Sequence, residues 1–288
     1  MNKLKLWLLI PGIVAITASS CTKDENENPE PTAPSAEGSA IIAGTKSCVL
    51  SKLIYDGGDY ETLEYDSKNR PVKINYFDSG TADGYAKITY SDTEVVMEYY
   101  DDKNVKDETY TYKLGSNGYI SGSSNAYTYN NGNYTVTVNS TSTNTHNSDG
   151  YLIKEEQSSV TTSNQPGFLS TTEKSSTTYT YTNGNLISAK YEGYGSTSTT
   201  TYEYDTDKLN NLPVSDDEVF TFLIGKKSKN LLKKEIYASS WGSDESSYTY
   251  TFNSDGLVSK QTSVSVRKQT GTPDQTDTDT YQFEYGCK

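Results

Sequence analysis

The residue types that most often carry out catalysis are scarce in this chain of 288 residues. His146 is its one histidine and lies in a polar run, Thr143–Asn147, which we interpret as a solvated loop rather than as part of a Ser-His-Asp triad. The sequence contains no His-Glu-x-x-His zinc motif, no Cys-x-x-Cys pair, no Gly-x-Ser-x-Gly elbow and no phosphate-binding loop. We therefore expect a protein that is not an enzyme and that carries no cofactor and no metal.

Carboxylates are abundant enough to keep two other chemistries open. The pairs Asp101-Asp102, Glu155-Glu156 and Asp216-Asp217 contain the residue types of a glycoside hydrolase, which needs two carboxyl groups set apart across a cleft. The oxygen-rich segments Asp56–Asp59 and Asp274–Asp279 are composed like calcium sites but lack the twelve-residue EF-hand spacing. We interpret both segments as turns.

Binding chemistry is better represented than catalysis. The chain has 26 tyrosines against 6 phenylalanines, and a tyrosine offers both a rigid ring and a hydroxyl group. Trp241 lies in a polar loop, Ser239–Ser243, where a core residue is unexpected. We therefore predict a ligand-binding surface of Trp241, Tyr237 and Tyr248 for a glycan or a protein. Packing of Trp241 over the mouth of a barrel is the alternative.

The three cysteines divide into one at the start and two in the body of the chain. Lys3 and Lys5 precede an apolar run, and small residues lead into Cys21, which is the pattern of a secretory signal peptide over residues 1–20. Ala18-Ser19-Ser20-Cys21 also resembles a bacterial lipobox, which implies that Cys21 becomes the lipidated N-terminus and the contact with the membrane. Ordinary cleavage that leaves a free thiol is the alternative.

A tether follows this cysteine. Residues 21–44 are rich in proline and acidic residues and have no apolar period, so they predict a disordered acidic linker. Lys23-Asp24-Glu25 resembles the export signal of surface lipoproteins in Bacteroidetes, which implies a lipid-anchored outer-membrane protein that faces the cell exterior. A tether that serves solubility alone is the alternative.

Cys48 and Cys287 remain for a disulfide, because an oxidising compartment favours their pairing. Such a bond would make the first and last strands neighbours and close the sheet. Two separately buried free cysteines are the alternative.

One repeated unit must position all of these residues. In Tyr248–Val258 aromatic residues alternate with Ser and Thr, and Asp255-Gly256 then supplies a hairpin turn. Related units occur at Tyr65–Val72, Tyr112–Ile120, Asn147–Leu152 and Tyr181–Leu186. The pattern predicts an all-β fold in a single domain over residues 45–288, an antiparallel meander of hairpins that forms a closed or nearly closed barrel or a large curved sheet.

One segment departs from this pattern. Ser215 and Glu218 have the spacing of a capping box and Gly225 follows the last apolar residue, which predicts a short helix near 216–224. We expect this helix to plug one end of the β structure and to leave the Leu209–Pro213 loop outside.

The charge of the chain excludes one class of partner. The formal net charge is −13, and no basic stripe is present that could follow phosphates, so we expect no binding to nucleic acid. The oligomeric state is not indicated.

Several features together carry a family resemblance. They are the lipobox, the acidic linker, the repeated Tyr-x-Tyr units, the segment Gly225–Leu231 and the terminal Tyr281–Cys287. The chain resembles an uncharacterised family of Bacteroidetes lipoproteins with a Tyr-rich, porin-like β domain. Tyr65-Asp66 and Tyr204-Asp205 also resemble the YD repeats of Rhs-type proteins. The resemblance implies fold and location and carries over no catalytic residue.

A porin-like fold raises the question of membrane insertion. The second face of the strands is polar, as in Thr199-Thr201-Glu203, whereas a spanning barrel needs an apolar outer band. We predict a surface-exposed lipoprotein that recognises an extracellular glycan or protein. A carrier of a small hydrophobic ligand inside the barrel is the first alternative, and a glycan-cleaving enzyme is the second.

Overall fold

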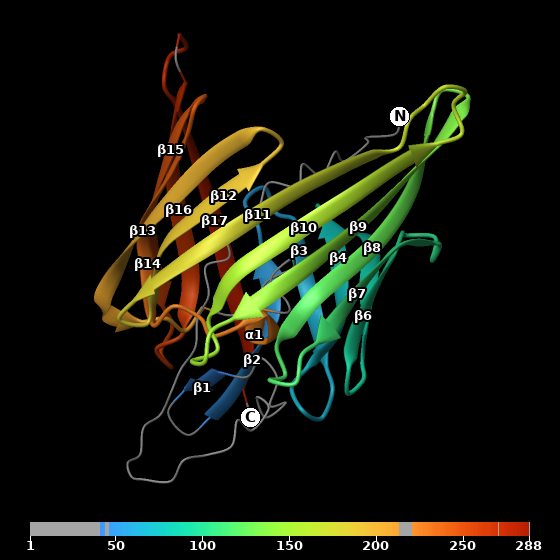
Figure 1. The fold of residues 1–288 in the computed structure, drawn as a ribbon. Coiled ribbons are helices and arrows are strands. Elements are labelled where there is room, and N and C mark those ends of the chain that lie inside the picture. The colour runs from blue at the N-terminus through green and yellow to red at the C-terminus, as the bar shows by residue number, and fades with distance from the viewer. Residues whose placement is uncertain (1–40, 44–45, 213–220, 270, 288) are drawn as a thin grey trace.

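The computed structural model describes residues 41–43, 46–212, 221–269 and 271–287. Strands β2 to β17 follow one another in chain order, each antiparallel to its neighbours, and β17 pairs back with β2 to close a 16-strand barrel (Figure 1). The prediction of an all-β meander is therefore confirmed, and the sheet is closed.

The elements have the following bounds: β1 Ile41–Ala43, β2 Lys46–Ile54, β3 Tyr60–Tyr65, β4 Pro71–Asp78, β5 Thr81–Tyr90, β6 Glu94–Tyr100, β7 Lys106–Leu114, β8 Ile120–Asn131, β9 Tyr134–His146, β10 Leu152–Ser163, β11 Thr171–Thr182, β12 Asn185–Gly193, β13 Ser196–Leu209, α1 Thr221–Ile224, β14 Asn230–Ser239, β15 Gly242–Phe252, β16 Val258–Gln269 and β17 Gln275–Cys287.

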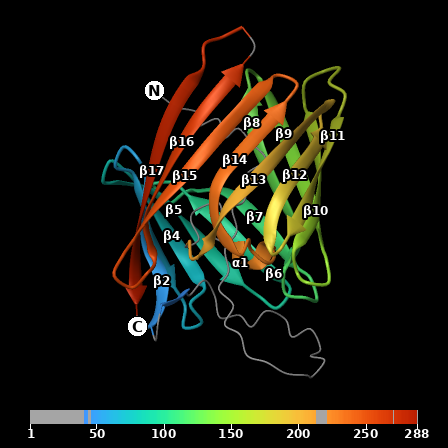
Figure 2. The same cartoon turned by 90° about the vertical axis from the view of Figure 1, so that its left-hand side faces the viewer.

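The closing pair of strands carries the predicted disulfide. Cys287 lies opposite Cys48 in the register between β17 and β2, and their sulfur atoms are 2.10 Å apart. Figure 2 shows β17 beside β2 on one side of the barrel. The short strand β1, which lies within the predicted linker of residues 21–44, pairs with the start of β2.

An up-and-down meander sends its turns alternately to two ends. The disulfide, the turns after the odd-numbered strands from β3 onward and the β13–β14 connection lie at the end that we call proximal (Figures 1 and 2). The turns after the even-numbered strands lie at the opposite end, which we call distal. The chain therefore enters the barrel, and leaves it at Cys287, on the proximal side.

The main core lies toward the proximal end. Leu53, Ile74 and Val95 are fully buried there, and they belong to a cluster that also contains Leu231 and Val258 from the opposite part of the chain. Val95 and Ile74 alternate with more exposed neighbours along their strands, as the period of a half-buried strand requires. These residues define the inner wall of the barrel.

The β13–β14 connection adds its own side chains to this core. Helix α1 covers only Thr221–Ile224 of the helix predicted near 216–224, and residues 213–220 lie outside the described part of the chain. Leu223 and Ile224 pack against the core cluster, so the connection plugs the proximal end as expected. Leu212 belongs to the same cluster and Asn210 is buried, so the prediction that Leu209–Pro213 lies outside is wrong at both residues and holds for the exposed Leu209, while Pro213 lies outside the described residues.

We call the described part of the β13–β14 connection, with helix α1, the plug. A buried network of hydrogen bonds holds it in place. The Asn230 amide N–H donates to Asn185 Oδ1 at 3.0 Å, and the Asn185 side-chain nitrogen donates back to Asn230 Oδ1 at 3.1 Å. Asn230 Nδ2 also donates to the carbonyl oxygens of Thr206 and Lys208. Ser228 joins the network by accepting from the Leu186 amide at 3.0 Å. Sequence reasoning did not identify this network.

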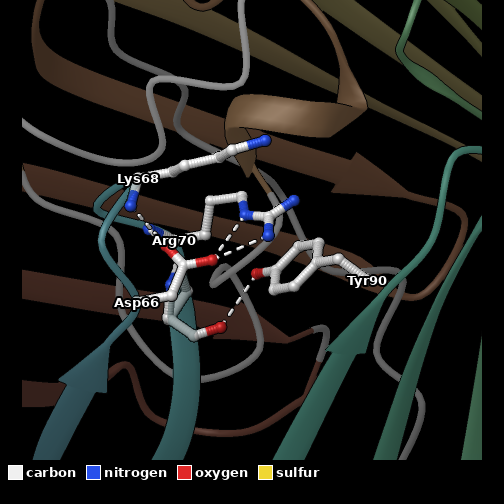
Figure 3. A network of polar contacts seen from close by, with 5 residues as sticks. Asp66, Lys68, Arg70 and Tyr90 are labelled. Atoms are coloured by element: carbon white, nitrogen blue, oxygen red, sulfur yellow. Dashed lines mark hydrogen bonds and ion pairs between the residues drawn. The ribbon is translucent and has the colours of Figure 1, made fainter.

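Polar contacts also fix the proximal hairpin turns. In the β3–β4 turn, Asp66 accepts hydrogen bonds from the Lys68 and Arg70 amides and forms an ion pair with the Arg70 guanidinium at 2.7 Å (Figure 3). Burial would raise the pKa of Asp66, but the contacts with Arg70 and Lys68 outweigh it and hold the pKa below its usual range. Arg70 also lies over the ring of Tyr90, 4.4 Å from its centroid.

The outer wall of the barrel is polar. On β9 the outward residues from Thr137 to Thr145 are threonines, apart from Asn139, and they alternate with inward residues such as Val136 and Val138. Outward lysines and glutamates form exposed ion pairs, including Lys154 with Glu156 at 2.8 Å. Within the described residues, no helix has the length and hydropathy required to span a membrane.

Candidate distal binding surface

The distal rim carries most of the large apolar side chains that remain exposed. The turns after β6, β8, β10, β12 and β14 are neighbours around the barrel, and each presents at least one such residue. These residues are Val105, Tyr129, Tyr134, Phe168, Leu169, Tyr194 and Trp241. Single exposed apolar residues are ordinary, but a series on adjacent turns is a mark of an interaction surface.

Trp241 forms the tip of the β14–β15 hairpin and is 77% exposed. Ser239 pairs with Gly242 across the turn, and the Trp241 amide donates to Ser239 Oγ at 3.2 Å. A Cβ atom at Gly242 would collide with the Lys268 carbonyl oxygen, so the backbone requires glycine there. The tip is thus held by its backbone while the indole ring stays in solvent.

The other two residues of the predicted binding surface lie elsewhere. Tyr237 is half-buried on the inner wall, where it pairs with Asp244. Tyr248 lies deeper, and its hydroxyl donates to Glu235 Oε1 at 2.7 Å. Burial and the nearby Glu235 raise the pKa of Tyr248. The structure therefore does not gather Trp241, Tyr237 and Tyr248 on one exposed surface.

Two tyrosines form a flat aromatic platform just inside the distal mouth. Tyr127 and Tyr129 lie on the inner face of β8, and their rings stack with centroids 6.2 Å apart. Tyr127 is 38% exposed and Tyr129 is 47% exposed, so both rings of the pair remain accessible. Burial raises the pKa of Tyr127, with smaller contributions from Tyr129 and Glu108.

His146 does not lie in a solvated loop, so that interpretation is wrong. It ends strand β9, its ring stacks on Tyr119 at 5.2 Å, and its Nε2 atom contacts the Ile224 carbonyl oxygen. The polar run before it forms a strand because β8 and β10 pair with it on both sides. His146 therefore fastens the plug to the barrel.

The two predicted carboxylate pairs that the structure describes do not form a catalytic cleft. Asp101 and Asp102 lie in the exposed β6–β7 turn, and Asp216-Asp217 lies outside the described residues. Glu155 and Glu156 are neighbours on one strand, so they face opposite walls, and Glu156 is paired with Lys154.

The inner wall nevertheless collects negative charge. Glu235 is largely buried beside Tyr248, and burial raises the pKa of its carboxyl, partly offset by the hydrogen bond from Tyr248. Arg267 is a cation of this wall and is paired with Asp244 at 3.3 Å. The strand registers place the following acids on the inner wall: Glu61, Glu108, Glu155, Glu173, Glu235, Asp244, Asp277 and Asp279.

The described parts of the chain show no metal centre and one open pocket of note. No group of three or more His, Cys, Asp or Glu side chains could hold a metal ion there. A shallow pocket of about 400 Å³ opens beside β12 and β13. Its lining includes Asn185, Tyr202, Tyr204 and Asn230, together with threonines and Lys229, and it contains no carboxylate.

Sequence reasoning missed Tyr194, Phe168 and Leu169, because they sit in distal turns outside the repeated unit, whose turns all lie at the proximal end. The sequence does contain a signal that marks these turns, which is a local absence of charge. The segments 120–145, 158–172, 193–202 and 236–243 contain no charged residue, although 22% of the chain is charged. Those four segments hold four adjacent distal turns.

Comparisons with known proteins agree with the fold. No family model matches the sequence, and no curated protein does. The structure is similar to a porin-like protein from Bacteroides uniformis ATCC 8492, with a TM-score of 0.55 and 18% identity over 82% of this chain and 98% of that one. It is also similar to a porin-like protein from Bacteroides vulgatus ATCC 8482, with a TM-score of 0.52 and 14% identity over the same shares. At these identities the likeness shows a porin-like β-barrel fold.

Proposed function

We propose that this protein is a lipid-anchored outer-membrane lipoprotein whose barrel recognises an extracellular glycan or protein without catalysing a reaction. The observation that carries the proposal is the series of exposed apolar side chains on adjacent distal turns, among them Trp241, Tyr194 and Leu169. These turns lie at the end opposite the one where the chain enters the barrel. A lipid on Cys21 would thus leave the distal surface directed away from the membrane.

The polar outer wall supports an anchored barrel rather than one embedded in lipid. Its threonines and its Lys-Glu ion pairs would each lose hydration in hydrocarbon. With an anchor at Cys21, the barrel can remain in water outside the bilayer.

The two alternative functions have less support. A carrier of a hydrophobic ligand needs an enclosed apolar cavity, whereas the pocket beside β12 and β13 is open to solvent. A glycan-cleaving enzyme needs two carboxyl groups across a cleft; Glu155 and Glu156 point to opposite walls, and none of the acids on the inner wall lines the pocket beside β12 and β13.

The test uses cells that display the protein, probed with an array of glycans and proteins. A distal variant combines Trp241→Ala, Tyr194→Ala and Leu169→Ala. A proximal control combines Leu209→Ala and Phe252→Ala, which remove side chains that are also exposed but lie at the other end. We expect the distal variant to lose binding by at least about tenfold, equivalent to about 1.4 kcal/mol, while the control binds like the parent. Equal binding by all three proteins would refute the proposed surface.

The anchor is tested on the same cells. Cys21→Ala should abolish labelling with a fatty-acid probe and release the protein from the membrane fraction. Protease added to intact cells should cleave the anchored parent if the barrel faces the exterior, and full protection would contradict that orientation.

A further inference from the structure

The distal rim is divided into two arcs of different chemistry. The turns after β8, β10, β12 and β14 belong to segments without a charged residue, and we call them the neutral arc. The turns after β2, β4, β6 and β16 contain or adjoin aspartates, and we call them the acidic arc. The acidic arc includes Asp56, Asp78, Asp101 and Asp274.

The barrel is what makes the neutral arc one surface. In the sequence its four segments are spread from residue 120 to residue 243, separated by charged stretches such as Lys154–Glu156. The strand order places β8 to β15 side by side, so the four turns are consecutive around the rim. At about 5 Å per strand, neighbouring turns are separated by about 10 Å at the barrel wall.

The side chains of the neutral arc are of two kinds. Rings come from Tyr129, Tyr134, Phe168, Tyr194 and Trp241, all of which are exposed. Between them lie amide and hydroxyl side chains, which include Asn131, Asn133, Asn164, Gln165 and Ser240. Rings cover the flat apolar faces of a sugar, and amides exchange hydrogen bonds with its hydroxyl groups.

Charge complementarity selects among possible partners. Protein interfaces normally use charged groups at their rim to orient the partner and to speed association. Binding to a lipid surface relies on lysine and arginine, and an acidic polymer needs cations. The neutral arc has no charged residue, and the acids of the inner wall and of the acidic arc would repel a polyanion.

Resting on the proposed function, we infer that the neutral arc binds an uncharged polysaccharide chain. Tyr194 and Trp241 stack on sugars along the arc, and the Tyr127–Tyr129 platform receives the chain at the barrel mouth. The acidic remainder of the rim excludes polymers that carry uronate or sulfate groups.

The experiment titrates the displayed protein with neutral glucan, mannan and galactan chains and with uronate- and sulfate-bearing chains of equal length. We expect binding to a neutral chain alone, with a Kd that changes less than about twofold between 0.05 and 0.5 M NaCl, because screening acts only between charges. Tyr194→Ala with Trp241→Ala should weaken that binding at least about tenfold. The Leu209→Ala and Phe252→Ala control should leave it unchanged.

Other outcomes separate this inference from the proposed function. Binding of acidic chains, or of a protein, would overturn the neutral-glycan inference. If that binding is lost in the variant with Tyr194→Ala and Trp241→Ala, the proposed function still stands. A strong salt dependence of neutral-chain binding would also overturn it. Neutral-chain binding that survives the distal variant would overturn both the inference and the proposed surface.

Discussion

At the scale of single residues, the hydroxyl groups explain why tyrosine outnumbers phenylalanine in this barrel. The Tyr250 hydroxyl donates to the Leu232 carbonyl at 2.7 Å, and Leu232 lies two residues before Lys234, where pairing with the next strand begins. The hydroxyl thus donates to a backbone carbonyl that lies before the first paired residue of β14 and β15. The same arrangement recurs in the contacts Tyr65–Leu50, Tyr90–Pro71 and Tyr285–Val258.

This arrangement predicts that Tyr250→Phe destabilises the fold although the ring is kept. The Leu232 carbonyl loses its donor in a partly buried place, so we expect the free energy of unfolding to fall by about 1 kcal/mol. Tyr194→Phe is the matched control, because Tyr194 is 60% exposed and should change stability by less than about 0.5 kcal/mol. Urea titration measures both changes. Equal stability of the two variants would show that the hydroxyl contact contributes nothing.

At the scale of elements, strands with recognisable alternation were predictable and strands of uniform polarity were not. Tyr134–Val138 alternates apolar residues with threonines, which is the pattern of a strand, and β9 begins at Tyr134. The strand continues to His146 through Ser, Thr and Asn residues, which carry no apolar period. Its pairing with β8 and β10, rather than any local signal, decides the conformation of that run.

The plug, too, was predictable from the sequence only in part. A capping pattern indicated a short helix, and α1 is present over Thr221–Ile224. Nothing in the sequence indicated that Asn185 and Asn230 would meet, because they are 45 residues apart and Asn is ordinarily a turn residue. The distal surface was found only at Trp241, because the repeated unit marks the proximal turns and says nothing about the distal turns that carry the other exposed rings.

The Asn185–Asn230 contact predicts how the plug is held. Replacement by Asn230→Ala removes the donors to the Thr206 and Lys208 carbonyls and leaves the buried Asn185 Nδ2 without its acceptor, while the backbone N–H of residue 230 still donates to Asn185 Oδ1. Buried polar groups that lose their partners cost about 1–3 kcal/mol each, so we expect a loss of at least about 2 kcal/mol. Hydrogen exchange should become faster at the Lys229 and Asn230 amides before it does in β5 and β6. Uniform acceleration across the barrel would contradict a local role for this network.

At the scale of the whole molecule, the barrel is plugged at one end and carries most of its exposed large apolar side chains at the other. The plug, the main core and the disulfide lie on the proximal side, where the chain also enters. The exposed rings lie on the distal side, where the strands end without a described plug. The elements that stabilise the fold and the proposed binding surface thus lie at opposite ends, so we expect distal side chains to be exchangeable at little cost to the fold.

The Cys48–Cys287 disulfide allows a test of whether stability and distal ligand binding are separable. It joins the first and last strands of the barrel through two cysteines that are 239 residues apart in sequence. A crosslink over so long a loop restricts the unfolded chain, and loss of a native disulfide commonly costs about 2–5 kcal/mol. We expect Cys48→Ala, Cys287→Ala and the double variant to lower the urea midpoint by the same amount, because each removes the same bond. Distal ligand binding should persist in all three below the transition, since the hydrogen bonds between β2 and β17 still close the sheet. Two free thiols in the non-reduced parent, or an additive effect of the two substitutions, would show that the bond does not form.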